Sequence, residues 1–117
     1  MNLQDIYINA VHHWDEIYII FRDKIPATIH AHLNTIILNS GKPISFGGEG
    51  CSYCDVFATK ENCTDCPIKA VTKRDHCLGT PWSMFYYSPT TANALAMREF
   101  VRIHPPEGVE VIEENKL

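Results

Sequence analysis

The feature of this sequence that most constrains its fold is a cluster of cysteines. All five cysteines of the 117-residue chain lie between residues 51 and 77: Cys51, Cys54, Cys63, Cys66 and Cys77. The first four form two Cys-x-x-Cys pairs separated by eight residues, and ten more residues separate the second pair from the fifth cysteine. Two such pairs allow four thiolates to converge on one ion, and a tetrahedron of sulfur ligands suits zinc. The sequence therefore predicts a structural Zn²⁺ site.

Five thiols are one more than a tetrahedral zinc site takes, so the choice of ligands stays open. Cys77 can replace one member of the second pair, or it can be a small buried hydrophobic residue. His76 is a further candidate ligand, although neighbouring side chains rarely both point at one metal. An iron–sulfur cluster is the alternative cofactor. Thiol redox chemistry is disfavoured because no thioredoxin-like βαβ pattern surrounds either pair.

The length, the N-terminal sequence and the net charge of the chain indicate its domain count, its compartment and its attraction to nucleic acid. A chain of 117 residues predicts one domain, of a size at which a metal often supplements the core. The first residues lack a basic segment followed by an apolar one, and no apolar run is long enough to cross a membrane, so we expect a cytoplasmic protein. Clustered thiols in a reducing compartment are more often ligands than disulfides. The net charge of −4 provides no overall attraction to nucleic acid.

Apolar periodicity predicts a helix near each end of the chain. Steps of three and four along residues 3–22 place a series of apolar residues on one helix face: Leu3, Ile6, Ala10, Trp14, Ile17 and Phe21. A strand over residues 17–21 is the alternative there. The sequence from Ser88 to Thr91 is a good helix start, because a hydroxyl can cap free backbone amides, and this helix is expected to reach about His104. Its expected buried residues are Leu95, Phe100 and Ile103.

The region between these helices gives a more mixed pattern. Helical spacing of Ile29, Leu33 and Ile36 predicts a helix over residues 27–38, which Asn39-Ser40-Gly41 would stop. A short strand is expected over residues 44–46. In the acidic tail, the apolar residues at 109–112 predict either a short edge strand or a frayed end.

The expected fold class is a helix-rich α+β domain in which two or three helices pack on a small zinc-knuckle module. A single domain spans residues 1–117. Within it we expect an N-terminal helical part (1–46), a zinc-finger-like module (47–87), a C-terminal helix (88–104) and the acidic tail (105–117).

The cysteine segment resembles a group of small phage and prophage proteins. The likeness rests on Cys51-Ser52-Tyr53-Cys54, on Cys63-Thr64-Asp65-Cys66-Pro67-Ile68, and on His76-Cys77-Leu78-Gly79-Thr80-Pro81-Trp82. Those proteins carry two Cys-x-x-Cys elements, the second followed by Pro-Ile, and a third cysteine followed by Thr-Pro and an aromatic residue. The likeness covers about residues 45–104 and departs at Tyr53, where a leucine is common. It implies a phage or prophage origin, metal binding and a ligand role for Cys77, and it implies little about activity.

Other residue groups suggest binding chemistry less specifically. A local basic patch could touch phosphate, with an aromatic residue to stack on a base: Lys60, Lys69, Lys73, Arg74 and Trp82. Acidic neighbours make a solvated face the stronger interpretation of those cations. The aromatic residues Trp82, Phe85, Tyr86 and Tyr87 are expected mainly to pack the cysteine module onto the helices. The pairs His12–His13 and His30–His32 are expected to be solvated rather than to bind metal.

The sequence contains no recognisable catalytic set, and four thiolates would leave zinc no open position for water. We therefore expect a non-enzymatic protein that binds a partner protein, such as a host protein that it inhibits if the chain is phage-encoded. The alternative is a nucleic-acid-binding accessory factor that uses the basic and aromatic patch. Homodimerisation through the first helix stays open.

Overall fold

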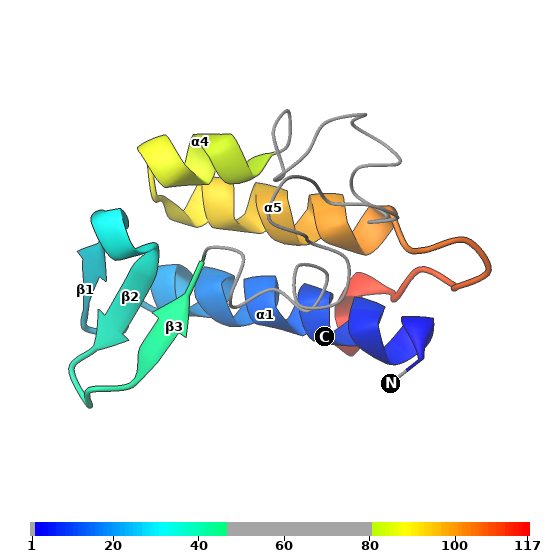
Figure 1. Ribbon diagram of the computed structural model, residues 1–117, viewed down its shortest axis with the longest axis horizontal. Coiled ribbons are helices and arrows are strands. Elements are labelled where there is room, and N and C mark those ends of the chain that lie inside the picture. The colour runs from blue at the N-terminus through cyan, green and yellow to red at the C-terminus, as the bar shows by residue number, and fades with distance from the viewer. Residues whose placement is uncertain (1, 47–80) are drawn as a thin grey trace.

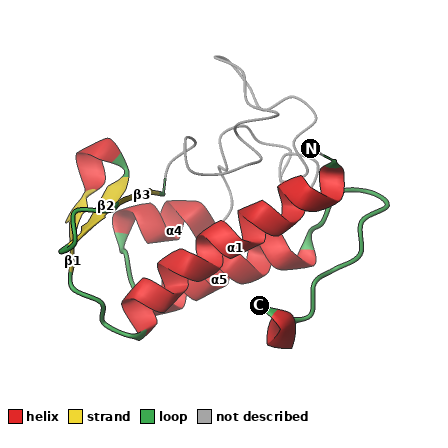
Figure 2. Ribbon diagram, turned by 90° about the horizontal axis from the view of Figure 1, so that it is seen from below, coloured by secondary structure: helices red, strands yellow, loops and turns green. Residues whose placement is uncertain are grey.

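The computed structural model describes residues 2–46 and 81–117 (Figure 1). The described elements are α1 (Leu3–Arg22), β1 (Ala27–His30), the 3₁₀ turn η1 (Ala31–Leu33), β2 (Thr35–Leu38), β3 (Pro43–Ser45), α4 (Pro81–Tyr87), α5 (Thr91–Ile103) and η3 (Glu114–Lys116). α1 and α5 lie side by side, α4 packs on α5, and the three-stranded antiparallel sheet lies at one end of these helices (Figure 2). The helix-rich α+β class is confirmed.

The predicted first helix is confirmed as α1, and the strand alternative over residues 17–21 is wrong. The side chain of Asn2 caps the helix by accepting a hydrogen bond from the Asp5 amide at 2.9 Å. Seven residues at helical spacing are buried: Ile6, Tyr7, Ala10, Val11, Trp14, Ile17 and Ile20. The helix ends where Lys24 takes a left-handed backbone conformation (φ 53°) and the Ile25 amide donates to the Ile20 carbonyl at 3.0 Å.

The last long helix is also confirmed, and its predicted buried face is correct in part, since Phe100 is partly buried and packs against the core. The Thr90 hydroxyl caps α5 by accepting from the Asn93 amide at 3.2 Å. The residues that α5 buries are Ala94, Met97, Arg98 and Val101, whereas Ile103 is 51% exposed. Arg98 was not among the residues predicted to be buried. Arg98 enters the contact with α1 because carboxylates from three parts of the chain compensate its charge.

The predicted helix over residues 27–38 is wrong, and so is the helical description of the whole N-terminal part. These residues form β1, η1 and β2, with Ile29 opposite Ile36, and Ile36 opposite Ile44 on β3. β-branched residues favour extended backbone, and Asn34 has a positive φ of 49° that a continuous helix could not contain. Gly41, predicted to stop a helix, takes its left-handed conformation (φ 91°) in the β2–β3 turn instead. The short strand expected near Ile44 is confirmed as β3.

The acidic tail packs against the helices and forms no edge strand. The buried Tyr7 hydroxyl donates to the Arg102 carbonyl and accepts from the Ile112 amide at 3.0 Å. The Arg102 side chain donates a hydrogen bond from Nη1 to the Ile112 carbonyl at 2.8 Å. Side chains thus satisfy both backbone groups of Ile112, so this residue needs no strand partner.

Candidate functional site

Most residues of the predicted site lie outside the part of the chain that the structure describes. These are the five candidate metal ligands, Cys51, Cys54, Cys63, Cys66 and Cys77, with His76, and the four basic residues Lys60, Lys69, Lys73 and Arg74. Among the predicted site residues, the structure places Trp82. Its surroundings show how the described scaffold holds the two ends of the cysteine segment.

A hydrogen bond ties the two ends of the segment together. The Trp82 indole Nε1 donates to the carbonyl oxygen of Phe46 at 2.7 Å, across 36 positions of sequence. Phe46 is 2% exposed, and its own amide donates to the Asn34 carbonyl at 2.8 Å. The chain therefore leaves the sheet and enters α4 at neighbouring points, which this hydrogen bond joins.

The scaffold beneath these two points is an aromatic cluster centred on Phe85. The Phe85 ring makes edge-to-face contacts with Trp14 at 5.5 Å, Phe21 at 5.6 Å and Phe46 at 5.3 Å between ring centroids. These are preferred aromatic geometries, and they join α1, α4 and the end of the sheet. Phe85 is buried against the helices, and its predicted role in packing the cysteine module onto them stays a prediction, because the module lies outside the described residues.

α4 also presents side chains outward. Trp82 stacks on Tyr86 with 5.3 Å between centroids and 26° between planes, and Tyr86 meets Tyr87 edge to face at 5.1 Å. Tyr87 is 83% exposed and Met84 is 58% exposed. Aromatic and methionine side chains of this kind are common anchors in protein interfaces. Met84 was missed in the sequence, because a lone methionine carries no pattern of its own.

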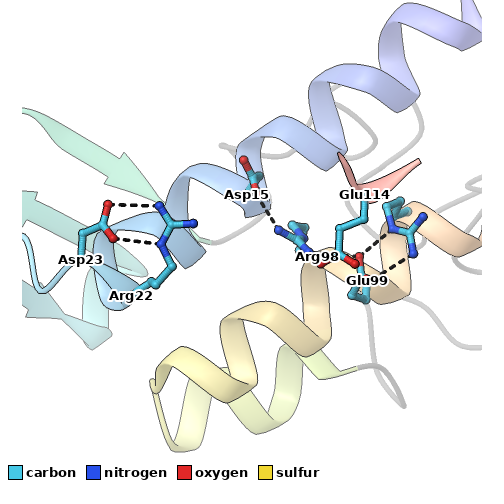
Figure 3. Close-up of polar contacts among 7 residues, drawn as sticks. Asp15, Arg22, Asp23, Arg98, Glu99 and Glu114 are labelled. Atoms are coloured by element: carbon cyan, nitrogen blue, oxygen red, sulfur yellow. Dashed lines mark hydrogen bonds and ion pairs between the residues drawn. The ribbon is translucent and has the colours of Figure 1, made fainter. Parts of the chain in front are cut away.

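A cluster of charged side chains surrounds Arg98 on α5 (Figure 3). Its guanidinium contacts Asp15 of α1 at 2.8 Å, Glu114 of the tail at 2.6 Å and Glu99 at 3.4 Å. The same group lies 5.0 Å from the centre of the Tyr18 ring, in cation–π range. Arg98 thus joins α1, α5 and the tail.

The electrostatics of this cluster favour its charged state. Burial alone would lower the pKa of Arg98, but hydrogen bonds to Asp15 and Glu114 outweigh burial and raise it. The pKa of Glu99 lies below its ordinary value, chiefly because Arg102 donates to that carboxylate at 2.6 Å. Ion pairs of this kind hold the two helices and the tail together. Sequence analysis missed the cluster; the available signal was an arginine at helical spacing within an otherwise apolar face.

Among the described residues, no metal-binding set surrounds the histidine pairs. His13 contacts Trp14 edge to face at 5.7 Å, and the His30 and His32 rings lie 6.0 Å apart. Within residues 2–46 and 81–117, no group of three or more His, Cys, Asp or Glu side chains could hold a metal ion. The described elements also include no helix with the length and apolar character needed to span a membrane.

Comparison of the chain with protein-family models, with curated proteins and with solved structures found no match.

Proposed function

We propose that this protein is a small, non-enzymatic zinc-binding protein that acts in the cytoplasm by binding a partner protein. The cysteine pattern is the observation that carries the proposal: two Cys-x-x-Cys pairs and a fifth cysteine within residues 51–77. Four of the five thiolates would hold Zn²⁺, and bound zinc would supply folding free energy to the segment between Phe46 and Trp82.

The described scaffold is consistent with a binding role in two respects. The ends of the cysteine segment are tied at one place by the Trp82–Phe46 bond, so a folded segment would project from a fixed base. Beside that base, α4 exposes Met84 and Tyr87, and the net charge of −4 suits a protein partner better than a phosphate backbone. If the chain is phage-encoded, a host protein whose activity it inhibits is the natural partner.

Metal analysis of the purified protein tests the first half of the proposal. About one equivalent of zinc, with a colourless protein, is the expected result. A brown protein with bound iron would replace zinc by an iron–sulfur cluster, and absence of any bound metal after anaerobic purification would refute the site.

A capture experiment from host lysate, with and without nuclease and at two salt concentrations, tests the second half. We expect one stoichiometric protein that survives both treatments and is lost with a Met84→Ser/Tyr87→Ser double variant. Leu33→Ser is the matched control, because Leu33 is 61% exposed on η1, a separate element from α4. Recovery that disappears with nuclease or salt would instead favour nucleic-acid binding through Lys60, Lys69, Lys73, Arg74 and Trp82.

A further inference from the structure

The sheet leaves part of its inward face uncovered at its edge. Ile29, Ile36 and Ile44 lie in register across the three strands, so their side chains share one face. Ile36 is fully buried and Ile44 is 6% exposed, but Ile29, on the edge strand β1, is 37% exposed. The row therefore begins in the core and ends in a partly open space.

That space is a half-open pocket of about 320 Å³ between the end of α1 and β1. Lys24 is the one charged residue among the described residues that line it, and the others carry apolar side chains: Ile20, Phe21, Ile25, Pro26, Ala27, Ile29 and Ile36. The volume lies at the small end of the range of ligand pockets, and such sites are lined mainly by apolar side chains with a few polar groups. Figure 1 shows the end of α1 close to β1, at the end of the molecule that carries the sheet.

Lys24 has two properties that distinguish it from the neighbouring cations. It has a positive φ of 53° at a helix-terminating position where glycine is the usual residue, so a lysine is held there at a cost in backbone strain. Arg22 is paired with Asp23 at 2.9 Å and Lys42 with Glu16 at 3.2 Å, but Lys24 has no carboxylate partner among the described residues. A single uncompensated cation thus lines an otherwise apolar pocket.

We propose that this pocket binds a small amphipathic monocarboxylate, with its hydrocarbon chain against Ile29 and Ile36 and its carboxylate at Lys24. The apolar walls exclude a highly charged ligand such as a nucleotide, because desolvated phosphates would find only one cation. The size of the pocket restricts the hydrocarbon to a short or medium chain. This inference does not depend on the zinc site or on the proposed protein partner.

Titration of the purified protein with a series from butanoate to decanoate, followed by NMR shifts of the pocket methyl groups, tests the proposal. Each added methylene should lower the dissociation constant about fourfold until the pocket is filled, which corresponds to ~0.8 kcal/mol per buried CH₂. Octanol should bind more weakly than octanoate. Absence of saturable shifts in the pocket, or affinity that does not depend on chain length, would overturn the proposal.

Two variants separate the cation from the cavity. Lys24→Gly should weaken octanoate binding about threefold to fivefold, leave octanol binding unchanged and raise the melting temperature, because glycine relieves the strained backbone. Ala27→Phe should fill the pocket and abolish binding of both ligands, with retention of the fold checked by circular dichroism. Lys42→Ala is the matched control and should change neither affinity. Equal loss in Lys24→Gly and Lys42→Ala would show non-specific attraction and refute the site.

Discussion

Removal of the Asp15 carboxylate should destabilise the protein by more than its place near the surface suggests. The Asp15 side chain is 15% exposed and accepts at 2.8 Å from Arg98, whose side chain is 5% exposed. A hydrogen bond to a charged group contributes roughly 1.5–3 kcal/mol, and stranding one member of a fully buried pair costs about 3–5 kcal/mol. Without Asp15, Arg98 would still have its ion pairs with Glu99 and Glu114, but the Glu114 side chain is 61% exposed. We therefore expect Asp15→Ala to cost about 2 kcal/mol.

Urea unfolding at fixed zinc concentration measures this cost, and Glu16→Ala is the matched control. Glu16 is the next residue on α1, and its ion pair with Lys42 joins side chains that are 48% and 62% exposed. That pair should contribute less than about 1 kcal/mol. With a typical m-value of roughly 1–3 kcal/mol/M, Asp15→Ala should lower the urea midpoint by about 1 M. Equal midpoints for the two variants would refute the reasoning.

A double-mutant cycle with Arg98→Met then isolates the Asp15–Arg98 interaction. Methionine keeps much of the buried volume of Arg98 but leaves the Asp15 carboxylate without its cation. The two single variants should each be destabilised, and the double variant should be less destabilised than their sum by about 1–3 kcal/mol. Additive effects would mean that the cluster holds Arg98 mainly by packing.

Three further predictions concern other parts of the chain. Tyr7→Phe should cost about 1–2 kcal/mol in urea unfolding, because it leaves the Ile112 amide and the Arg102 carbonyl without the hydroxyl that bridges them; an unchanged midpoint would show that the tail does not depend on this bridge. The pKa of Glu99 is lower in the folded state than its ordinary value of 4.5, so its contribution to stability is full above about pH 4.5 and is lost as the pH falls through the folded-state value. Glu99→Gln should therefore flatten the loss of melting temperature on acidification below pH 4.5, and identical acid profiles for the variant and the wild type would contradict this. Cys54→Ser should lose zinc and lower the melting temperature sharply, while a mild effect of Cys77→Ser would assign zinc to the two Cys-x-x-Cys pairs.

The two long helices were predictable because their signals are local. α1 and α5 each combine apolar residues at steps of three and four with a side-chain cap, at Asn2 and at Thr90, and both kinds of signal depend only on nearby residues. The cysteine spacing is local in the same sense, which is why it predicts a metal site from sequence; its residues lie outside the described ranges, and the site stays a prediction.

The buried face of α5 shows where local reasoning fails. Whether an arginine can enter a core depends on where carboxylates from other segments lie. Asp15 lies 83 positions before Arg98 and Glu114 lies 16 positions after it, so no window of the sequence contains the whole cluster. The choice of large apolar residues as the buried set was reasonable for α5 in isolation, and it missed Arg98 because burial of a charge is decided by distant partners.

The sheet and its pocket also depend on contacts between distant parts of the chain, as the burial of Arg98 does. Ile29, Leu33 and Ile36 fit a helix by spacing, but Ile29 and Ile36 also fit one face of two paired strands, and tertiary pairing with β3 is consistent only with the second. Once the hairpin forms, the inward direction of Ile29 follows from strand alternation. Whether Ile29 is covered depends on where α1 ends, and that end is fixed by the left-handed turn at Lys24. The open space and the cation that lines it, Lys24, thus arise from the same backbone position. Lys24→Gly therefore changes the charge of the pocket and the strain of the turn together, and the comparison of octanoate with octanol separates the two effects.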